Sequence, residues 1–270
     1  MDSFLTRAKR VIHRATQPPL PPGAHERVRL ARMPRYVETV TELPGFLFRI
    51  PDGPSFLSSW EEIFDREIYD FNAGAGPVRI LDCGANVGVS CLFFSRRFPE
   101  AKITAFEPDP KIFAYLQGNL ASGGCRNVEL LAQAVWSENT TLRFQSEGAD
   151  AGRVDAGGGK GLIEIPAVRL RDFLTGPVDL LKLDIEGAET VVLKDIAPNL
   201  HWVRHLFVEY HSFAAKPQTL GEIVQLLTDG GFRLHFQPMF PAPRPFIEVP
   251  SHLGMDMQLN IFGWREAAAG

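Results

Sequence analysis

The sequence lacks the features that mark membrane and secreted proteins. Its 270 residues contain no run of about 18 apolar residues, the length that a membrane-spanning helix needs. The N-terminal MDSFLTRAKRVIHRAT has basic residues, but neither the apolar core nor the small-residue cleavage site of a secretory signal. Only three cysteines are present, Cys83, Cys91 and Cys125, with no C-x-x-C pair, so a disulfide framework and a cysteine zinc site are both excluded. We therefore expect a cytoplasmic protein.

A strongly basic main body is also missing. Residues 1–36 contain eight Lys or Arg and two acidic residues, a net charge of +6, whereas the whole chain carries −4 and the remainder therefore −10. Because nucleic acids attract basic surfaces, an acidic main body argues against a nucleic-acid partner.

The first 45 residues are set apart by their composition. An initial stretch places apolar residues at helical spacing, with bases largely on the opposite face: Phe4, Leu5, Ala8, Val11, Ile12 and Ala15. Such a helix either packs on its own domain or a partner subunit, which we favour, or lies on a membrane surface. The proline-rich QPPLPPG then interrupts it. We predict a basic N-terminal helix and proline-rich extension over residues 1–45, through which a homo-oligomer could form.

The rest of the chain has the pattern of an α/β protein. Residues 46–75 predict a pre-core cap, with a short hairpin around Pro51-Asp52-Gly53 and a helix in WEEIFDREIYDF. Over residues 76–266, strands alternate with helices of about 10–15 residues, which predicts βαβ units and a mainly parallel sheet. VELLAQAVW is predicted to be one strand. The closing strands FRLHFQP and MQLNIFGW have no helix between them, so they predict an antiparallel edge hairpin.

A glycine-containing turn in ILDCGANVGVS carries the clearest chemical signal. Its strand ends in Asp82, and a helix begins after Gly88. Ligands of open α/β sheets bind beyond the carboxyl ends of the strands, where glycines let them approach the backbone. The spacing D-x-G-x-x-x-G differs from the G-x-G-x-x-G of dinucleotide folds. An acid before the first glycine suits a cationic group better than a pyrophosphate, so the turn favours S-adenosylmethionine, which has an ammonium and a sulfonium.

A second acid ends the next strand. Glu107 follows Gly84 by 23 residues in ITAFEP, where a carboxylate can accept hydrogen bonds from both ribose hydroxyls. Either Asp82 or Glu107 alone could instead be a helix-capping or first-turn residue stabilised by the helix dipole. Their occurrence at successive strand ends, together with the glycine turn, favours a nucleoside cofactor. By contrast, GGGKGL in the Gly-rich segment 152–161 is predicted to be a surface loop, because a phosphate loop needs Ser or Thr after Lys160.

Four stretches together carry a family resemblance. DCGANVGVS, FEPDPKIFAYLQGN, LLKLDIEGAETVVL and FVEYH, in this order, resemble the FkbM-type S-adenosylmethionine-dependent methyltransferases. The resemblance covers about residues 46–211 and implies a class I methyltransferase Rossmann-like fold, with a mainly parallel seven-stranded sheet and helices on both faces. It implies O-methylation, often of a sugar or natural product. The cofactor-binding residues that it implies are Asp82, Gly84, Ala85, Asn86, Gly88, Glu107, Pro108, Asn119, Ala134, Val135 and Asp184.

The resemblance also suggests how the acceptor loses its proton. Asp184 ends the strand that faces the acceptor in this fold, and an alcohol needs a base or a metal ion to lose its proton. We expect His211 to be the base, oriented by Asp184 or Glu186. Asp184, Glu209 and His211 could instead hold Mg²⁺ or a similar divalent ion. Glu189 is predicted to complement a helix dipole.

The sequence therefore predicts an S-adenosylmethionine-dependent O-methyltransferase with a small hydroxylated acceptor. Acceptor contacts are expected first from the segment up to Tyr69 and then from the proline-rich connection between the closing strands. An NAD(P)-dependent oxidoreductase is weakened by the missing G-x-G-x-x-G. A DNA or RNA methyltransferase is weakened by the acidic body and the lack of an Asn/Asp-Pro-Pro-aromatic motif. A non-catalytic cofactor-binding scaffold subunit is disfavoured by the joint presence of Asp82, Glu107, Asp184 and His211.

Overall fold

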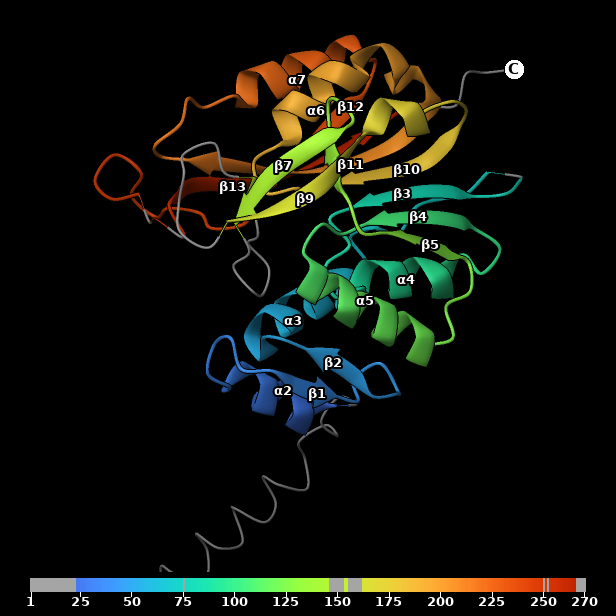
Figure 1. The fold of residues 1–270 in the computed structure, drawn as a ribbon. Helices are drawn as coiled ribbons and strands as arrows, with labels where there is room; N and C mark the ends of the chain where they lie inside the picture. The colour runs from blue at the N-terminus through green and yellow to red at the C-terminus, as the bar shows by residue number, and fades with distance from the viewer. Residues whose placement is uncertain are drawn as a thin grey trace, which may run out of the picture.

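A seven-stranded sheet organises the computed structural model, which describes residues 23–74, 76–145, 153–154, 162–249, 251 and 253–265 (Figure 1). The predicted N-terminal helix, the proline-rich break before Gly23 and most of the Gly-rich loop lie outside these residues. The strand order is β12-β13-β11-β10-β3-β4-β5. The strands are β3 (Arg79–Cys83), β4 (Lys102–Phe106), β5 (Val128–Leu131), β10 (Val178–Leu183), β11 (Val203–Phe213), β12 (Arg233–Pro238) and β13 (Met255–Trp264).

The sheet has the class I methyltransferase topology. Strands β5, β4, β3, β10 and β11 are parallel, whereas β13 runs antiparallel to both β11 and β12. The predicted fold class and the antiparallel hairpin at the sheet edge are therefore confirmed. Within the described part of the chain, no helix is long and apolar enough to cross a membrane.

Helices cover both faces of the sheet (Figure 1). One apolar cluster packs α4 (Val89–Arg97) and α5 (Pro110–Ser122) against one face. A second packs α6 (Glu189–Ile196) and α7 (Leu220–Asp229) against the other. Since parallel strands are buried on both faces, their near-continuous apolar runs are what such a sheet requires.

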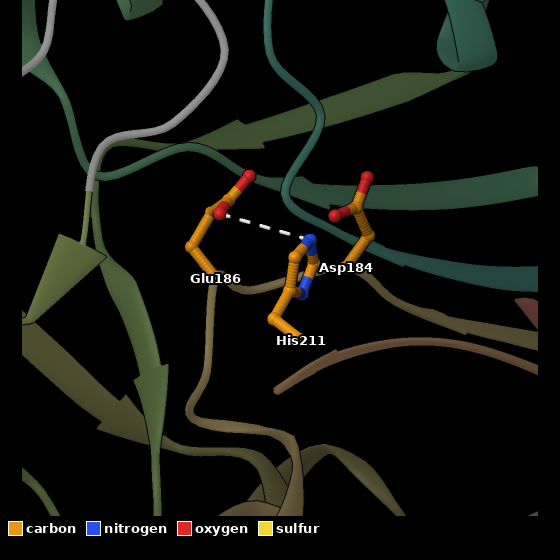
Figure 2. A group of neighbouring side chains, drawn as sticks. All are labelled: Asp184, Glu186 and His211. Carbon is orange, nitrogen blue, oxygen red and sulfur yellow. Dashed lines mark ion pairs between the residues drawn. The ribbon is translucent and has the colours of Figure 1, made fainter. Parts of the chain in front are cut away.

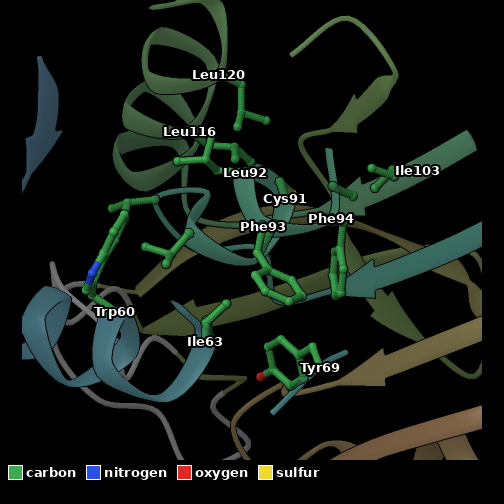
Figure 3. Packing of buried hydrophobic residues seen from close by; sticks show 14 of the residues in the cluster. Trp60, Ile63, Tyr69, Cys91, Leu92, Phe93, Phe94, Ile103, Leu116 and Leu120 are labelled. Atoms are coloured by element: carbon green, nitrogen blue, oxygen red, sulfur yellow. The ribbon is translucent and has the colours of Figure 1, made fainter. Parts of the chain in front are cut away.

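An N-terminal unit lies over α4 and α5. It consists of α2 (Ala24–Ala31), β1 (Thr39–Thr41), β2 (Phe48–Ile50), α3 (Gly53–Trp60) and a π-helical turn, Glu61–Asp65. Figure 3 shows Ile63 and Tyr69 beside Phe93 and Phe94 of α4, and Trp60 belongs to the same apolar cluster. The ring centroids of Tyr69 and Phe94 lie 5.7 Å apart, within the range of favourable aromatic pairs. This packing fixes α3 beside the carboxyl ends of the core strands.

Two local predictions for this unit are wrong. The hairpin pairs β2 with β1, and Pro51-Asp52-Gly53 is no hairpin turn but the start of α3. The Asp52 carboxylate accepts a hydrogen bond from the Ser55 backbone N–H at 2.8 Å, as an N-cap residue does. WEEIFDREIYDF does not form a helix throughout, because the π-helical turn that continues α3 ends at Asp65.

A smaller four-stranded sheet, ordered β6-β9-β7-β8, adjoins the core. It contains β6 (Ala134–Trp136), β7 (Thr140–Gln145), β8 (Arg153–Val154) and β9 (Leu162–Arg169). VELLAQAVW is therefore not one strand. It divides between β5, in the main sheet, and β6, which pairs with β9 in parallel.

Candidate active site

A cavity of about 190 Å³ lies beyond the carboxyl ends of β3, β10 and β11. The turn after β3, residues 84–87, lines one side, and Asp184, Glu186 and Glu209 line another. Both segments expected to contact an acceptor also line it. The N-terminal unit contributes Phe56, the segment that follows it contributes Tyr69, and the connection between β12 and β13 contributes Phe240. Asp184, Glu186 and Glu209 thus form an acidic cavity floor, and the walls include apolar side chains.

The glycines of the turn are required by packing within the chain. Gly84 has a φ of +87°, and a Cβ there would overlap the carbonyl oxygen of Asp184. Gly88 has a φ of +98°, and its Cβ would lie 2.8 Å from Leu116 Cδ1 in α5. Both conformations are strained for residues with a side chain. The expected role of these glycines is thereby refined: they let β10 and α5 approach the turn that lines the cavity.

Asp82 does not face the cavity. Its side chain is fully buried, with Oδ1 3.3 Å from Lys182 Nζ and Oδ2 accepting a hydrogen bond from Ser90 Oγ at 2.6 Å. Lys182 Nζ also pairs with Asp184 at 3.3 Å and donates to the Gly84 carbonyl at 2.8 Å. The cationic partner predicted for Asp82 is therefore a lysine of the chain itself. Lys182 links the β3 turn to the acid that ends β10.

Glu107 holds the same turn from the end of β4. Its Oε2 accepts the Asn86 backbone N–H and its Oε1 accepts the Asp109 backbone N–H, each at 2.9 Å. Burial raises the pKa of Glu107 to about 7, although these two hydrogen bonds oppose the rise. A carboxylate with two anchored oxygens suits a ligand that offers two hydroxyls.

His211, on β11, lies between Glu186 in the loop after β10 and Glu189 at the start of α6. Figure 2 shows its ring beside Asp184 and Glu186. It is 4% exposed, and the cavity-lining set includes Asp184 and Glu186 but not His211. Its Nδ1 is 3.0 Å from Glu189 Oε1 in the first turn of α6, and its Nε2 is 3.7 Å from Glu186 Oε2. The residue that orients His211 is therefore Glu189, where Asp184 or Glu186 was expected.

The electrostatics of this group differ from those of a free histidine. Burial alone would lower the pKa of His211, but Glu186, Glu189 and Glu209 outweigh it and raise that pKa well above its usual value. Burial and neighbouring acids raise the pKa of Glu186 as well, and that of Glu209 to about 8. The acids around His211 therefore favour its protonated form more than water does.

The remaining predicted residues occupy other places. Asn119 accepts the Arg49 backbone N–H and donates to the carbonyls of Arg49 and Val87, so it joins β2, α5 and the turn. The side chains of Ala134 and Val135 are buried in two apolar clusters. Pro108, between Glu107 and Asp109, is partly buried, and Ala85 and Asn86 line the cavity.

Sequence reasoning missed two residues that organise this site, Lys182 and Glu189. A single lysine inside an apolar strand needs a buried anionic partner, so Lys182 could have been singled out from LLKLD. In the sequence alone, the position of Glu189 is explained equally well by an interaction with the helix dipole. Its 1% exposure and its bonds to the Gly187 backbone N–H and His211 arise only in the folded chain.

Several known proteins are similar to this chain in sequence. The family model for the methyltransferase FkbM domain matches residues 82–234, more than half of the chain. A protein of Sordaria araneosa named methyltransferase sdnD is 31% identical over 214 residues, covering 64% of this chain and 80% of that protein. The 31-O-demethyl-FK506 methyltransferase FkbM of Streptomyces tacrolimicus is 28% identical over 192 residues, covering 57% and 72%. The 2-O-methyltransferase NoeI of Sinorhizobium fredii is 27% identical over 167 residues, covering 54% and 68%.

Proposed function

Because this chain belongs to the FkbM methyltransferase family, we propose that it transfers a methyl group from S-adenosylmethionine to a hydroxyl oxygen of a small molecule. The proposal rests chiefly on one observation: a single cavity joins the turn after β3 to Asp184 and Glu186, which follow β10, and to Glu209 on β11. Two of the relatives have oxygen methylation in their names, which supports oxygen as the acceptor atom. A sugar or natural-product intermediate is the acceptor class we propose.

The residues present fit this cofactor. Glu107 has both carboxylate oxygens anchored by backbone N–H groups, with lone pairs left for the two ribose hydroxyls. Asp82 is fully buried, whereas Asp184 lines the cavity, so Asp184 is the acid that we assign to the positive charge of the methionine part. When bound, S-adenosylmethionine would supply a methyl group whose bond to the sulfonium sulfur breaks readily, because the sulfur leaves as a neutral thioether.

The chain itself positions the acceptor oxygen and accepts the proton that its hydroxyl loses. Holding an acceptor oxygen close to a methyl group removes much of the entropic barrier of a two-molecule reaction. The apolar side chains of Phe56, Ile63 and Met255, which line this space, disfavour water there. The hydroxyl must also lose its proton, and we assign this task to the group formed by Asp184, Glu186 and His211.

Methyl transfer itself tests the proposed function. The purified chain would be incubated with isotopically labelled S-adenosylmethionine and a panel of sugars and hydroxylated natural products, each paired with its deoxy analogue. We expect mass spectrometry to find the labelled methyl group on the hydroxylated members only. Transfer to a nitrogen or carbon atom, or equal transfer to the deoxy analogues, would contradict O-methylation.

The pKa of Glu107 predicts how cofactor binding depends on pH. Its ionised form accepts the ribose hydroxyls, and with a pKa of about 7 that form grows from a small to a large fraction between about pH 6 and about pH 8. Affinity for S-adenosylhomocysteine, measured by calorimetry, is therefore expected to rise about tenfold over this interval. Glu107→Gln should remove the rise, whereas Glu100→Gln, an exposed site before β4, should keep it. An unchanged rise in Glu107→Gln would show that another group is responsible.

A further inference from the structure

Three possible metal-ligand atoms converge beside the cavity. One atom each from Asp184, Glu186 and His211 lies within 4.8 Å of the others, and Figure 2 shows both carboxylates turned toward the imidazole. Ligands held about 2.1 Å from an ion stand roughly 3 Å apart when adjacent and roughly 4.2 Å apart when opposite. The separation of 3.7 Å between Glu186 Oε2 and His211 Nε2 falls between these values. Small side-chain rotations would bring all three atoms to one ion.

The buried imidazole is held in the orientation of a metal ligand. The side chains of His211 and Glu189 are each 1% exposed, and Glu189 Oε1 binds His211 Nδ1 at 3.0 Å. Glu189 Oε1 is itself fixed by the Gly187 backbone N–H at 2.9 Å. Carboxylates commonly hold the distal ring nitrogen of ligating histidines in this way. The bond leaves Nε2, rather than Nδ1, to face Asp184 and Glu186.

The contacts of His211 Nε2 are all long. It lies 3.4 Å from Gln258 Nε2, 3.7 Å from Glu186 Oε2 and 3.9 Å from Glu209 Oε1. The first is at the outer limit of a hydrogen bond and the other two are beyond it. Nε2 of this buried ring therefore makes only weak polar contacts with these three groups, and coordination to an ion could replace them.

Charge favours a cation at this position. Asp184, Glu186 and Glu209 meet at the cavity floor, and the nearby Lys182 is shared between Asp184 and the fully buried Asp82, at 3.3 Å from each. Like charges at short range in a partly dehydrated site repel strongly. A doubly charged ion offsets this repulsion better than one shared ammonium.

We propose that Asp184, Glu186 and His211 bind a divalent metal ion, Mn²⁺ or Mg²⁺, at the cavity floor. The ion's role in catalysis rests on the proposed function, although its binding does not. Two carboxylate oxygens and one imidazole nitrogen suit Mn²⁺ and Mg²⁺, and this set contains no thiolate. Binding would displace the proton from His211 Nε2. The chemistry that such an ion supplies is a lower pKa for a neighbouring hydroxyl, which links this site to the acceptor's proton.

Direct titration with Mn²⁺ tests the site without relying on activity. Free Mn²⁺ would be followed by electron paramagnetic resonance after the whole chain has been stripped with a chelator. We expect one ion per chain with a submillimolar dissociation constant. Glu186→Gln should weaken binding at least about tenfold, and so should Asp184→Asn. No saturable binding at millimolar Mn²⁺ would overturn the proposal.

A matched variant separates coordination from general attraction. Glu62 lines the same cavity but is outside the three-residue set, so Glu62→Gln removes one negative charge without removing a ligand. We expect it to change Mn²⁺ affinity less than about threefold. An equal loss in Glu62→Gln and Glu186→Gln would mean diffuse attraction and would refute the site. Circular dichroism would verify that each variant is folded, and the two ligand variants are independent of each other.

Cofactor binding distinguishes this proposal from the proposed function. S-Adenosylhomocysteine would be titrated calorimetrically in the presence of chelator. Binding of the nucleoside without any Mn²⁺ binding would refute the metal site and leave the methyltransferase proposal intact. Binding of Mn²⁺ without binding of the nucleoside would support the metal site and contradict the methyltransferase proposal.

Discussion

Gly84→Ala is expected to lower the free energy of unfolding by about 4 kcal/mol or more, the range reached when a backbone position cannot accept a side chain. The new Cβ would overlap the carbonyl oxygen of Asp184, and the φ of +87° is strained for alanine. Because that oxygen belongs to the backbone, no side-chain rotation relieves the overlap. The turn after β3 and the end of β10 would have to separate. Urea unfolding followed by circular dichroism measures the effect.

Gly118→Ala is the matched control for this prediction. Gly118 is exposed within α5, and its Cβ would meet no atom within 4 Å in the described part of the chain. Replacing an exposed helical glycine by alanine should stabilise the chain by about 0.5–1 kcal/mol. Wild-type stability in Gly84→Ala would show that Asp184 and Gly84 do not pack as described.

Glu186→Gln is expected to lower turnover about 100-fold or more while leaving S-adenosylhomocysteine affinity within about threefold of wild type. Glu186 lies on the cavity floor and reaches His211, whereas the cofactor's ribose is assigned to Glu107 at the end of β4. The substitution keeps the size of the side chain but removes a carboxylate from the group to which we assign removal of the acceptor's proton. Steady-state kinetics on the identified acceptor, with calorimetry in parallel, separate the two effects.

The control for this second prediction is Glu100→Gln, which makes the same chemical change at an exposed position before β4. It should retain both turnover and affinity. Full turnover in Glu186→Gln would remove this residue from the catalytic group. A parallel loss of affinity and turnover would instead place it among the cofactor contacts.

The sheet could be predicted because its determinants are local. Apolar runs alternating with helical periods in residues 76–266 require βαβ units, and the missing helix between β12 and β13 requires an antiparallel pair. The prediction of a hairpin turn at Pro51-Asp52-Gly53 was wrong because its outcome depended partly on a residue distant in the chain. The same three residues suit a turn or a helix start, and the choice depended on contacts with Arg35 and Ser55.

The site could be predicted only in outline. Strand ends identified Asp82, Glu107, Asp184 and His211, because parallel strands bring their carboxyl ends to one edge of the sheet. Their partners come from pairings distant in the chain. Asp82 contacts Lys182 because β3 pairs with β10. His211 contacts Glu189 because the start of α6 packs beside β11. No spacing rule could say that the acid of the glycine turn would be neutralised within the protein.

Calorimetric titration with S-adenosylhomocysteine tests the central claim most directly. The account predicts micromolar binding to the wild-type chain, its loss in Glu107→Ala, its retention in Glu100→Ala and no binding of NADH. Binding of NADH in place of the homocysteine product, or unchanged affinity in Glu107→Ala, would contradict it.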